Sequence, residues 1–559
     1  MKKQSACFWV MGGVLVLLGL FSIYLALNRI YQVDEAQNVF TSRLIGAGLT
    51  QEFIADGRIW IAALSGLARL ARTSVELFAW ERLIFVGVFW ANLLLITLGS
   101  GYSLRNIKGL GMLMFVATLA PLWDYGFEIR HDNLLLLGLL ISWWLVRTPR
   151  RWAFAALGAL GVLLQFCSFK AFLYFTPLSL GLLLFPPPVQ TAGRPKNLIH
   201  FVLGIGLALL AVWWFCSVMG TWQFVMKDFQ GSVGVSKAVE RFSPWLTLRR
   251  PFLQAPFLMG ATAAFLWLCG ARMKAQRLGF FSWDSGFPEA LLLLGSLAIL
   301  LLNPTPFPYN LVLVIPFAAI AVVKLLDPTL EAMEAFPNLR PLAFGLLMFT
   351  HIVPFTHATL RHLDWSNDRQ ELLMNTAEAL TDPDKDRVYD AVGLVPTRKS
   401  IGYNWFLHSL NMEKFRNGTW PSVESMMIMN PPSVIIPNYR TNWLGEKDWR
   451  FIRSHFVPLS DDFWVLGGAI PPGGGEWTCI HGGRYLILVQ TAGGFHPPTQ
   501  LQVDGAQMPA AVPVELGPGA HHLQIPSGAP GVIVWVGPQL NQVPTLSTSD
   551  HNQVFVNWY

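Results

Sequence analysis

Long apolar runs alternate with short polar connections over the first 360 residues of the chain. Each run is about 15 to 22 residues long, close to the length of helix that spans a hydrocarbon core of about 30 Å. The pattern therefore predicts about eleven transmembrane helices. They are expected at residues 8–28, 80–99, 109–125, 133–147, 152–169, 171–186, 198–219, 255–271, 287–303, 309–326 and 341–357.

Basic residues are concentrated in alternate connections between these runs. Because cytoplasmic loops of membrane proteins carry an excess of Lys and Arg, the N-terminus is predicted to be cytoplasmic and the C-terminal part to lie on the outer face. Two outer loops, 29–79 and 220–254, are too long to be simple connectors. The first contains an amphipathic segment, 59–70, that suits the membrane interface. The basic residues are Lys2, Lys3, Arg105, Lys108, Arg147, Arg150, Arg151, Arg194, Lys196, Arg272, Lys274, Arg277, Lys324 and Arg340.

The chain becomes more polar after about residue 360, which predicts a soluble extracytoplasmic domain over 361–559. Its first part, 361–480, reads as mixed helix and strand, with short strands at 387–390 and 433–436. In its second part, 481–559, short strands at 485–489, 501–505 and 531–535 are separated by Gly and Pro, a spacing that favours a β-sandwich.

Composition agrees with this division. Hydrophobic residues make up 53% of the 559 residues and charged residues only 13%, whereas soluble domains carry roughly 25% charged residues. The net charge of +6 does not indicate nucleic-acid binding, because the basic residues lie in short loops between apolar runs. The predicted fold class is a polytopic α-helical membrane protein with a C-terminal α/β plus β-sandwich-like domain.

Two clusters of ionisable residues lie at the predicted outer ends of helices. Asp34 and Glu35 follow the first apolar run directly, and residues 128–133 carry Glu128, Arg130, His131 and Asp132 before the run at 133–147. Adjacent carboxylates at a membrane edge are costly unless they are solvated or bind something. A solvated loop start explains the first cluster alone, but both clusters are predicted to face the same compartment, where they could meet.

Further polar residues are predicted at the same face. Lys170 lies at an outward turn between two apolar helices, where it either snorkels to the interface or binds an anion. The turn at 303–310 offers the amide of Asn303 and the phenol of Tyr309, although its prolines alone would explain it as a helix break. Carboxylates that take a proton from an acceptor, together with cations that hold a phosphate leaving group, suit transfer of an activated sugar.

The order of these features resembles the membrane glycosyltransferases of the GT-C class, in particular the protein O-mannosyltransferase and aminoarabinose-transferase group. The matching residues are Asp34-Glu35 after the first helix, Arg130-His131-Asp132 at the fourth helix, Lys170 at a helix turn, and Pro308-Tyr309 before a Pro-containing helix. The resemblance covers about residues 1–360. His131 departs from the family pattern, where a Pro often stands.

The resemblance implies transfer of a sugar, with inversion, from a polyprenyl-phosphate donor to a glycolipid, polysaccharide or protein acceptor on the outer face. Asp34 would be the catalytic base or the group that orients the acceptor, while Glu35 and Asp132 would shape the site or bind a divalent cation. Mg or Mn suits these carboxylates, and His131 would let Zn compete. Arg130, His131 and Lys170, with Tyr309 and Asn303, would bind the donor phosphate.

Two other kinds of protein share this pattern of helices. A lipid or solute transporter should place its ionisable residues at the bilayer midplane, often in repeated halves, whereas here they lie at helix ends and no repeat is seen. A non-catalytic sugar-binding scaffold would not need Asp34, Asp132 and Lys170 together. The unpaired cysteines favour a bacterial inner membrane as the location, and no nucleic-acid partner is expected.

Overall fold

The computed structural model describes most of the chain. The described residues are 2–555 except 50–58, 149, 185–193, 227–248, 250–252, 277–286, 303–306, 333–338, 404, 408–411, 413, 416, 492–493, 510, 526–527 and 547–553. The predicted outer loop 220–254 and Asn303 therefore lie largely or wholly outside the described residues.

The chain forms two compact units. The first comprises Met1–Arg29, Gly57–Ala62 and Ala79–Trp365, and the second comprises Ile30–Asp56, Ala63–Phe78 and Ser366–Tyr559. The second unit thus takes in two pieces of the predicted outer loop 29–79 in addition to the C-terminal residues. The predicted domain limits, 1–360 and 361–559, stay a prediction.

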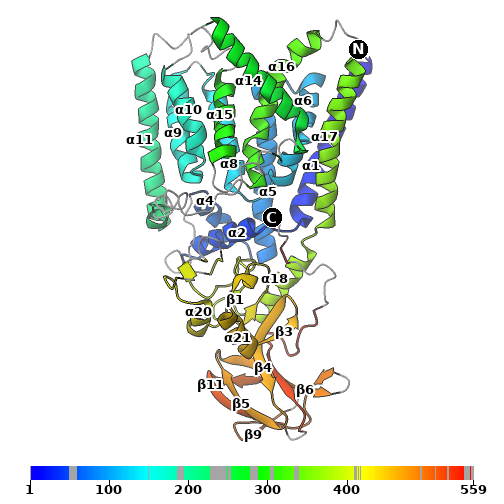
Figure 1. Ribbon diagram of the computed structural model, residues 1–559. Coiled ribbons are helices and arrows are strands. Elements are labelled where there is room, and N and C mark those ends of the chain that lie inside the picture. The colour runs from blue at the N-terminus through cyan, green and yellow to red at the C-terminus, as the bar shows by residue number, and fades with distance from the viewer. Residues whose placement is uncertain are drawn as a thin grey trace. The chain divides into compact units, whose positions relative to one another are not determined.

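Helices make up the first unit (Figure 1). Each apolar run predicted to span the membrane is helical over most of its length. The helices that correspond to these runs are α1 (Lys2–Asn28), α5 (Ser74–Gly99), α6 (Ile107–Ala117), α7 (Ala120–Tyr125), α8 (His131–Leu145), α9 (Arg151–Cys167), α10 (Ala171–Leu184), α11 (Arg194–Val218), α14 (Pro256–Gln276), α15 (Phe287–Leu302), the 3₁₀ helix η4 (Pro308–Leu313), α16 (Ile315–Ala332) and α17 (Leu339–Asp364).

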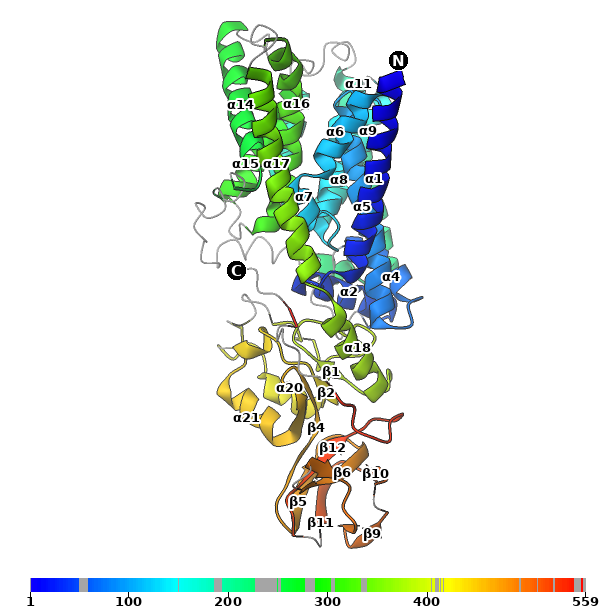
Figure 2. The same ribbon diagram turned by 90° about the vertical axis from the view of Figure 1, so that its right-hand side faces the viewer.

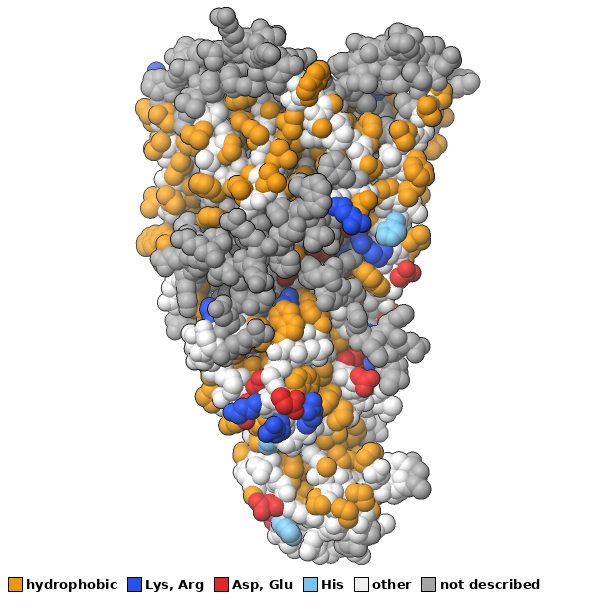
Figure 3. Space-filling model, in the orientation of Figure 1, with side chains coloured by type: hydrophobic (Ala, Val, Ile, Leu, Met, Phe, Trp, Pro, Cys, Tyr) orange, Lys and Arg blue, Asp and Glu red, His pale blue; other side chains and the backbone are white. Residues whose placement is uncertain are grey.

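Three stretches of the described helices are long and apolar enough to cross a membrane, namely Ala6–Asn28, Ser74–Gly99 and Lys196–Val218. They support the membrane location that the sequence predicts. Shorter apolar helices account for most of the other predicted spans, so the number of crossings and their orientation stay predictions. Hydrophobic side chains cover much of the visible helix surface (Figure 3), and Leu207 and Trp214 on α11 are 67% and 64% exposed. Such side chains suit contact with lipid.

Two of the predicted spans are divided in the structure. The run at 109–125 breaks into α6 and α7 because Pro121, in the first turn of α7, cannot donate a helical backbone hydrogen bond. The run at 309–326 begins as η4 before it continues as α16. Pro308 at the first turn of η4 fixes the entry of this helix, and Tyr309 and Asn310 follow it directly.

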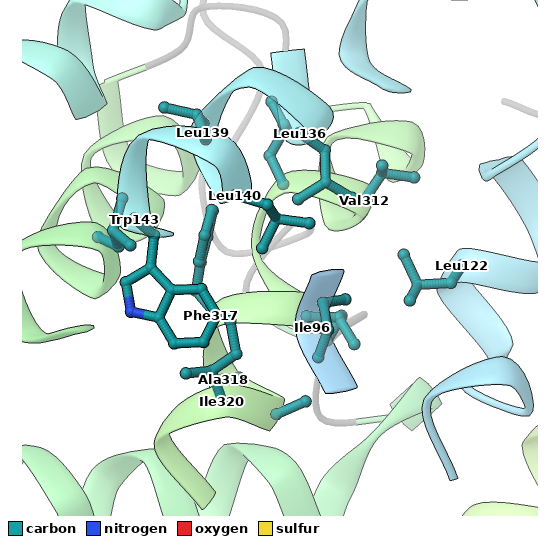
Figure 4. Close-up of a cluster of buried hydrophobic side chains, with 14 of the residues drawn as sticks. Ile96, Leu122, Leu136, Leu139, Leu140, Trp143, Val312, Phe317, Ala318 and Ile320 are labelled. Atoms are coloured by element: carbon teal, nitrogen blue, oxygen red, sulfur yellow. The ribbon is translucent and has the colours of Figure 1, made fainter. Parts of the chain in front are cut away.

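The core of the first unit lies between α5, α7, α8, η4 and α16. Trp143 on α8 is fully buried, and Leu136, Leu140, Val312 and Phe317 surround the same space (Figure 4). Figure 2 shows α14, α15, α16 and α17 as one packed group of helices within this unit. The core thereby fixes the start of α8 against η4, where several of the predicted site residues lie.

Small residues let α9 and α11 approach closely. A Cβ on Gly158 would lie 2.2 Å from the carbonyl oxygen of Phe201, and a Cβ on Gly204 would lie 2.0 Å from that of Ala155. Because lipid-embedded helices associate by close packing rather than by a hydrophobic driving force, paired glycines are an efficient contact.

The second unit contains α2 (Val33–Gly46), most of α4 (Ile59–Ala68) and a C-terminal region of helices and sheets. An eight-stranded sheet has the order β1-β2-β4-β12-β6-β10, with β3 beside β4 and β7 beside β6; a four-stranded sheet has the order β5-β11-β8-β9. The bounds are α18 (Asp368–Leu380), β1 (Val388–Tyr389), α20 (Val423–Met429), β2 (Val434–Ile435), η6 (Thr441–Trp443), α21 (Glu446–His455), β3 (Phe456–Ser460), β4 (Phe463–Ile470), β5 (Gly474–Cys479), β6 (Gly483–Thr491), β7 (Gly494–His496), β8 (Leu501–Val503), β9 (Ala506–Met508), β10 (Val514–Leu516), β11 (Gly519–Gln524) and β12 (Gly531–Trp535).

The C-terminal sheet domain predicted from the sequence is confirmed. The predicted strands at 387–390, 433–436, 485–489, 501–505 and 531–535 correspond to β1, β2, β6, β8 and β12. Among the strands that the structure describes, β1 and β2 pair in parallel, with Val388 opposite Val434. The other strands pair antiparallel.

Residues just after α1 are bonded into this C-terminal region. The backbone N–H of Tyr31 donates to Gln370 Oε1 at 2.7 Å, and the Gln370 amide donates back to the carbonyl of Tyr31 at 3.0 Å. Asn367 Nδ2 donates to the Tyr31 hydroxyl at 2.9 Å. These bonds place α2, which carries Asp34 and Glu35, in the same compact unit as β1 and β2.

Candidate functional site

The start of α8 carries the densest group of charges in the candidate site. Arg130 occupies the position just before the helix, and Asp132 is in its first turn, where a negative charge is favoured by the helix dipole. Asn133 fixes the preceding loop, because its Nδ2 donates to the carbonyls of Tyr125 and Glu128, both at 2.9 Å. These bonds hold the loop 125–130 in one conformation just before α8 begins.

Asp132 lies at the centre of this cluster and is 1% exposed. Lys170 Nζ donates to its Oδ1 at 2.7 Å, Arg130 Nε lies 3.6 Å from its Oδ2, and His131 Nε2 lies 3.5 Å from Oδ1. Buried charges are stable only when they are paired and hydrogen-bonded. Three basic groups therefore hold Asp132 as a carboxylate.

Lys170 and Arg130 also meet at one aromatic ring. The guanidinium carbon of Arg130 lies 3.5 Å from the centroid of the Tyr309 ring, and Lys170 Nζ lies 5.0 Å from it. Lys170 Nζ donates a second hydrogen bond, of 2.6 Å, to Asn310 Oδ1. The 3₁₀ turn of η4 thus brings Tyr309 and Asn310 to cations from two other segments.

Further charged residues, Arg29 and Glu128, connect this cluster to the end of α1. Arg29, 1% exposed, lies 3.2 Å from Glu128 Oε1 and donates to the carbonyl of Asp124 at 2.7 Å. Glu128 Oε2 in turn lies 4.0 Å from Arg130. Three basic groups (Arg29, Arg130 and Lys170) thus alternate with two carboxylates, Glu128 and Asp132.

Asp34 and Glu35 lie in the second unit, in the first turn of α2. Glu35 is buried, and its Oε2 accepts the backbone N–H of Gln32 at 2.9 Å, a bond that caps the helix. Asp34 is partly exposed. The structure therefore places Arg130, His131, Asp132, Lys170 and Tyr309 together in the first unit. The joint action of Asp34 and Glu35 with them stays a prediction.

The residues around Asp132 do not fit a divalent cation. Both carboxylate oxygens face basic groups, and a metal bound there would stand against Lys170 and Arg130. Among the described residues, no group of three or more His, Cys, Asp or Glu side chains is placed to hold a metal ion. The part of Asp34 and Glu35 in metal binding stays a prediction.

Three polar residues near the cluster were not assigned a role from the sequence. Asn310 and Glu128 contact Lys170 and Arg130, and Arg29 pairs with Glu128. Asn310 lies in the first turn of η4 and Asp132 in the first turn of α8, each at the start of an apolar run, and this position is the signal that could have identified Asn310. Arg29 gives no such signal, because a basic residue after an apolar run is ordinary.

A buried ion pair elsewhere in the first unit has a structural role. Glu289 at the start of α15 pairs with Arg147 after α8 and accepts a hydrogen bond of 2.9 Å from the indole of Trp143. The guanidinium of Arg147 also stacks on that indole at 4.2 Å. These contacts lock α8 to α15 at the helix end opposite Asp132, so they fix the register of α8.

The fold is thus that of a helical protein with membrane-compatible helices and a C-terminal sheet domain. Two of the solved structures that resemble it are of oligosaccharyltransferases. One is the archaeal oligosaccharyltransferase AglB from Archaeoglobus fulgidus in complex with an inhibitory peptide and a dolichol-phosphate, with a TM-score of 0.48, 11% identity, and coverage of 87% of this chain and 74% of that chain. The other is the Archaeoglobus fulgidus oligosaccharyltransferase in complex with Zn and sulfate, with a TM-score of 0.46, 13% identity, and coverage of 86% and 72%.

Both neighbours are oligosaccharyltransferases. At TM-scores of 0.48 and 0.46 and identities of 11% and 13%, the likeness assigns neither an activity nor a substrate to this chain. No protein-family model and no curated protein matches the sequence.

Proposed function

We propose that this protein is a membrane glycosyltransferase that moves a sugar from a polyprenyl-phosphate donor to an acceptor on the outer face, with inversion at the sugar carbon. The observation that carries the proposal is the pair of cations, Arg130 and Lys170, on either side of Asp132 and against the Tyr309 ring. The phosphodiester of such a donor matches this arrangement, and so does the phosphate monoester that leaves, because guanidinium and ammonium groups both form charge-assisted bonds to phosphate oxygens.

In this proposal the two cations bind the phosphate that joins the lipid to the sugar. The bond between the anomeric carbon and the phosphate oxygen breaks, and its electron pair leaves with the polyprenyl phosphate. Arg130 and Lys170 stabilise the charge that develops on this leaving group. Because both cations are already held by Asp132, Asn310 and Tyr309, little reorganisation accompanies the reaction.

Asp34 is the proposed base. Its carboxylate takes the proton of the acceptor hydroxyl or amine as the acceptor attacks the anomeric carbon from the face opposite the phosphate. Asp34 suits this part better than Asp132, because Asp34 is partly exposed whereas Asp132 is buried among three basic groups. In the proposal, Asp132 positions Lys170 and Arg130. Glu35 caps the start of α2.

The test uses purified protein in detergent with a panel of polyprenyl-phosphate sugars, and with membrane extract as the acceptor source. The readout is release of free polyprenyl phosphate, measured with and without EDTA. Asp34→Asn should lower release by about 10²–10⁴-fold, the usual contribution of a positioned base. Asp368→Asn is a matched control, since Asp368 is a first-turn carboxylate of another helix in the same unit and is exposed.

Asp34→Asn with near-normal turnover would remove Asp34 from the part of base. Binding of polyprenyl phosphate without release from any donor would instead favour the lipid transporter or the sugar-binding scaffold.

A further inference from the structure

The two parallel strands of the second unit end at the same edge of their sheet. β1 is followed by Asp390 and β2 by the segment 436–443. Ligands of sheets with parallel strands bind outside the carboxyl ends of those strands, because the loops there converge. This edge is therefore the part of the second unit in which a binding site is expected.

The loop after β1 packs against α2. The Asp390 carboxylate accepts the backbone N–H groups of Val392, Gly393 and Leu394 at 2.5 to 2.8 Å, which folds the loop tightly. Gly393 has φ +90°, and a Cβ there would lie 2.6 Å from Cβ of Phe40 on α2. Helix α2, which carries Asp34 in its first turn, is thus in direct contact with the loop at this edge.

The loop after β2 is held rigidly by Asn438, which is 8% exposed. Its Nδ2 donates to the carbonyls of Asp390 and Ile436 at 2.7 and 3.1 Å, and its Oδ1 accepts the backbone N–H of Arg440 at 2.9 Å. Its own N–H donates to Thr441 Oγ1 at 2.8 Å. A surface loop that is merely solvated does not need so many internal bonds, so the side chains on it are presented in a fixed arrangement.

On this loop, the side chains of Tyr439, Arg440 and Trp443 form a stack of two aromatic rings and one cation. The guanidinium of Arg440 lies 4.3 Å from the ring centroid of Trp443 and 5.1 Å from that of Tyr439, and the two rings meet edge to face with centroids 6.4 Å apart. Trp443 is 37% exposed. Burial raises the pKa of the Tyr439 phenol, the Arg440 cation lowers it, and the negative charge of Asp34 raises it. Asp34 lies in the first turn of α2, the helix that packs against the loop after β1.

We propose that Tyr439, Arg440 and Trp443, together with Asp34, bind the acceptor, and that the acceptor is a saccharide with a phosphate or carboxylate group near its reacting hydroxyl. The aromatic rings offer apolar faces to the C–H face of a sugar ring. Arg440 binds the negative group as a charge-assisted pair. This inference deepens the proposed function and rests on it, since Asp34 would take the proton of the hydroxyl that this site orients.

Two simpler ligands would each use only part of this site. A neutral sugar would stack on Trp443 without using the guanidinium, and inorganic phosphate would use the guanidinium without the rings. An acceptor that uses both should bind more tightly than either. Charge and ring together also fix one orientation of the sugar, as transfer to a single hydroxyl requires.

The experiment measures binding to the purified full chain in detergent by calorimetry. The probes are glucose 1-phosphate, methyl glucoside, inorganic phosphate and undecaprenyl phosphate. Each is titrated into the wild type, Arg440→Gln, Trp443→Ala, Lys170→Met and the control Arg453→Gln. Arg453 is a matched arginine, because it lies over the ring of Trp449 in the same unit and is exposed.

We expect glucose 1-phosphate to bind at least tenfold more tightly than methyl glucoside or inorganic phosphate. Arg440→Gln and Trp443→Ala should each weaken this binding about tenfold, the effect of losing one charge-assisted contact or one ring contact. Arg453→Gln should leave it unchanged. Binding of undecaprenyl phosphate should depend on Lys170 and not on Arg440.

The two proposals fail differently in this experiment. If glucose 1-phosphate binds no better than the neutral sugar, or if its binding depends on Lys170 and not on Arg440, the acceptor site is wrong and the proposed function stands. If undecaprenyl phosphate does not bind, or binds independently of Lys170, the proposed function is wrong.

Discussion

Lys170 and Asp132 form a hydrogen-bonded ion pair in which Nζ lies 2.7 Å from Oδ1. The lysine side chain is 17% exposed and the aspartate side chain 1%. The pair therefore joins the turn before α10 to the start of α8 and leaves the lysine, but not the carboxylate, within reach of a ligand.

The first prediction concerns the stability of this pair. Lys170→Met should destabilise the protein by about 3 kcal/mol, because it removes the strongest partner of a buried carboxylate. Asp132→Asn should also destabilise the protein, because it removes the carboxylate that Lys170 and the buried Arg130 share. Thermal unfolding in detergent measures both. The double variant Asp132→Asn/Lys170→Met should be more stable than Lys170→Met alone, and strictly additive losses would show that the two side chains are not coupled.

A second prediction separates the ring of Tyr309 from its hydroxyl. Tyr309→Leu removes the aromatic face beneath Arg130 and should weaken binding of undecaprenyl phosphate about fivefold to thirtyfold, the equivalent of about 1–2 kcal/mol for a partly desolvated cation–π contact. Tyr309→Phe keeps the face and should bind nearly as the wild type does. Equal losses in the two variants would assign the effect to the hydroxyl instead.

The helices were largely predictable from the sequence, because each apolar run with few charges forms a helix whatever its neighbours are. The breaks within the predicted spans were less predictable. Pro121 lies inside a run of the right length, and only its place in the first turn of α7 shows that it begins a new helix. In the second unit, alternating apolar residues between Gly and Pro predicted β6 and β12, whereas a short edge strand such as β9 carries too little pattern to be seen.

The site was predictable as a set of residue types but not as a geometry. Charges at helix ends identified Arg130, Asp132 and Lys170, because charges there must be solvated or paired. That Asp132 is enclosed by three basic groups depends on the approach of the turn at Lys170 to α8, which no local pattern specifies. Tyr439, Arg440 and Trp443 look like an ordinary polar loop in the sequence. Only the bonds of Asn438 show that they are held together.

A third prediction tests the contact between α2 and the loop after β1. Gly393→Ala should destabilise the second unit by about 2 kcal/mol or more, because the new methyl group meets Phe40 and the backbone has a positive φ. Gly473→Ala is the matched control: its φ is +84° but nothing lies within 4 Å of the added Cβ. The control therefore measures the backbone cost alone, and thermal unfolding in detergent compares the two. Equal losses would mean that the loop does not press on α2.

A fourth prediction concerns the pH dependence of stability in the four-stranded sheet. Asp504 and Gly505 form the turn between β8 and β9, both with positive φ, and His521 Nδ1 lies 2.7 Å from Asp504 Oδ2. This hydrogen bond raises the pKa of His521 above its usual 6.5. A raised histidine pKa means that the folded state holds the proton more tightly. The pair therefore stabilises the fold fully below pH 6.5, and this stabilisation is lost as the pH rises through the raised pKa.

Asp504→Asn keeps the turn, because Asn also tolerates a positive φ, but it removes the charge that raises the pKa of His521. The variant should melt below the wild type at pH 6, where His521 is protonated, and the difference should shrink at pH 8.5 as the histidine loses its proton. Melting curves in detergent at several pH values measure this difference, with Asp461→Asn, a change at an exposed carboxylate in the same unit, as the control. A difference that stays constant across this range would show that the Asp504 carboxylate acts on the turn and not through the charge of His521.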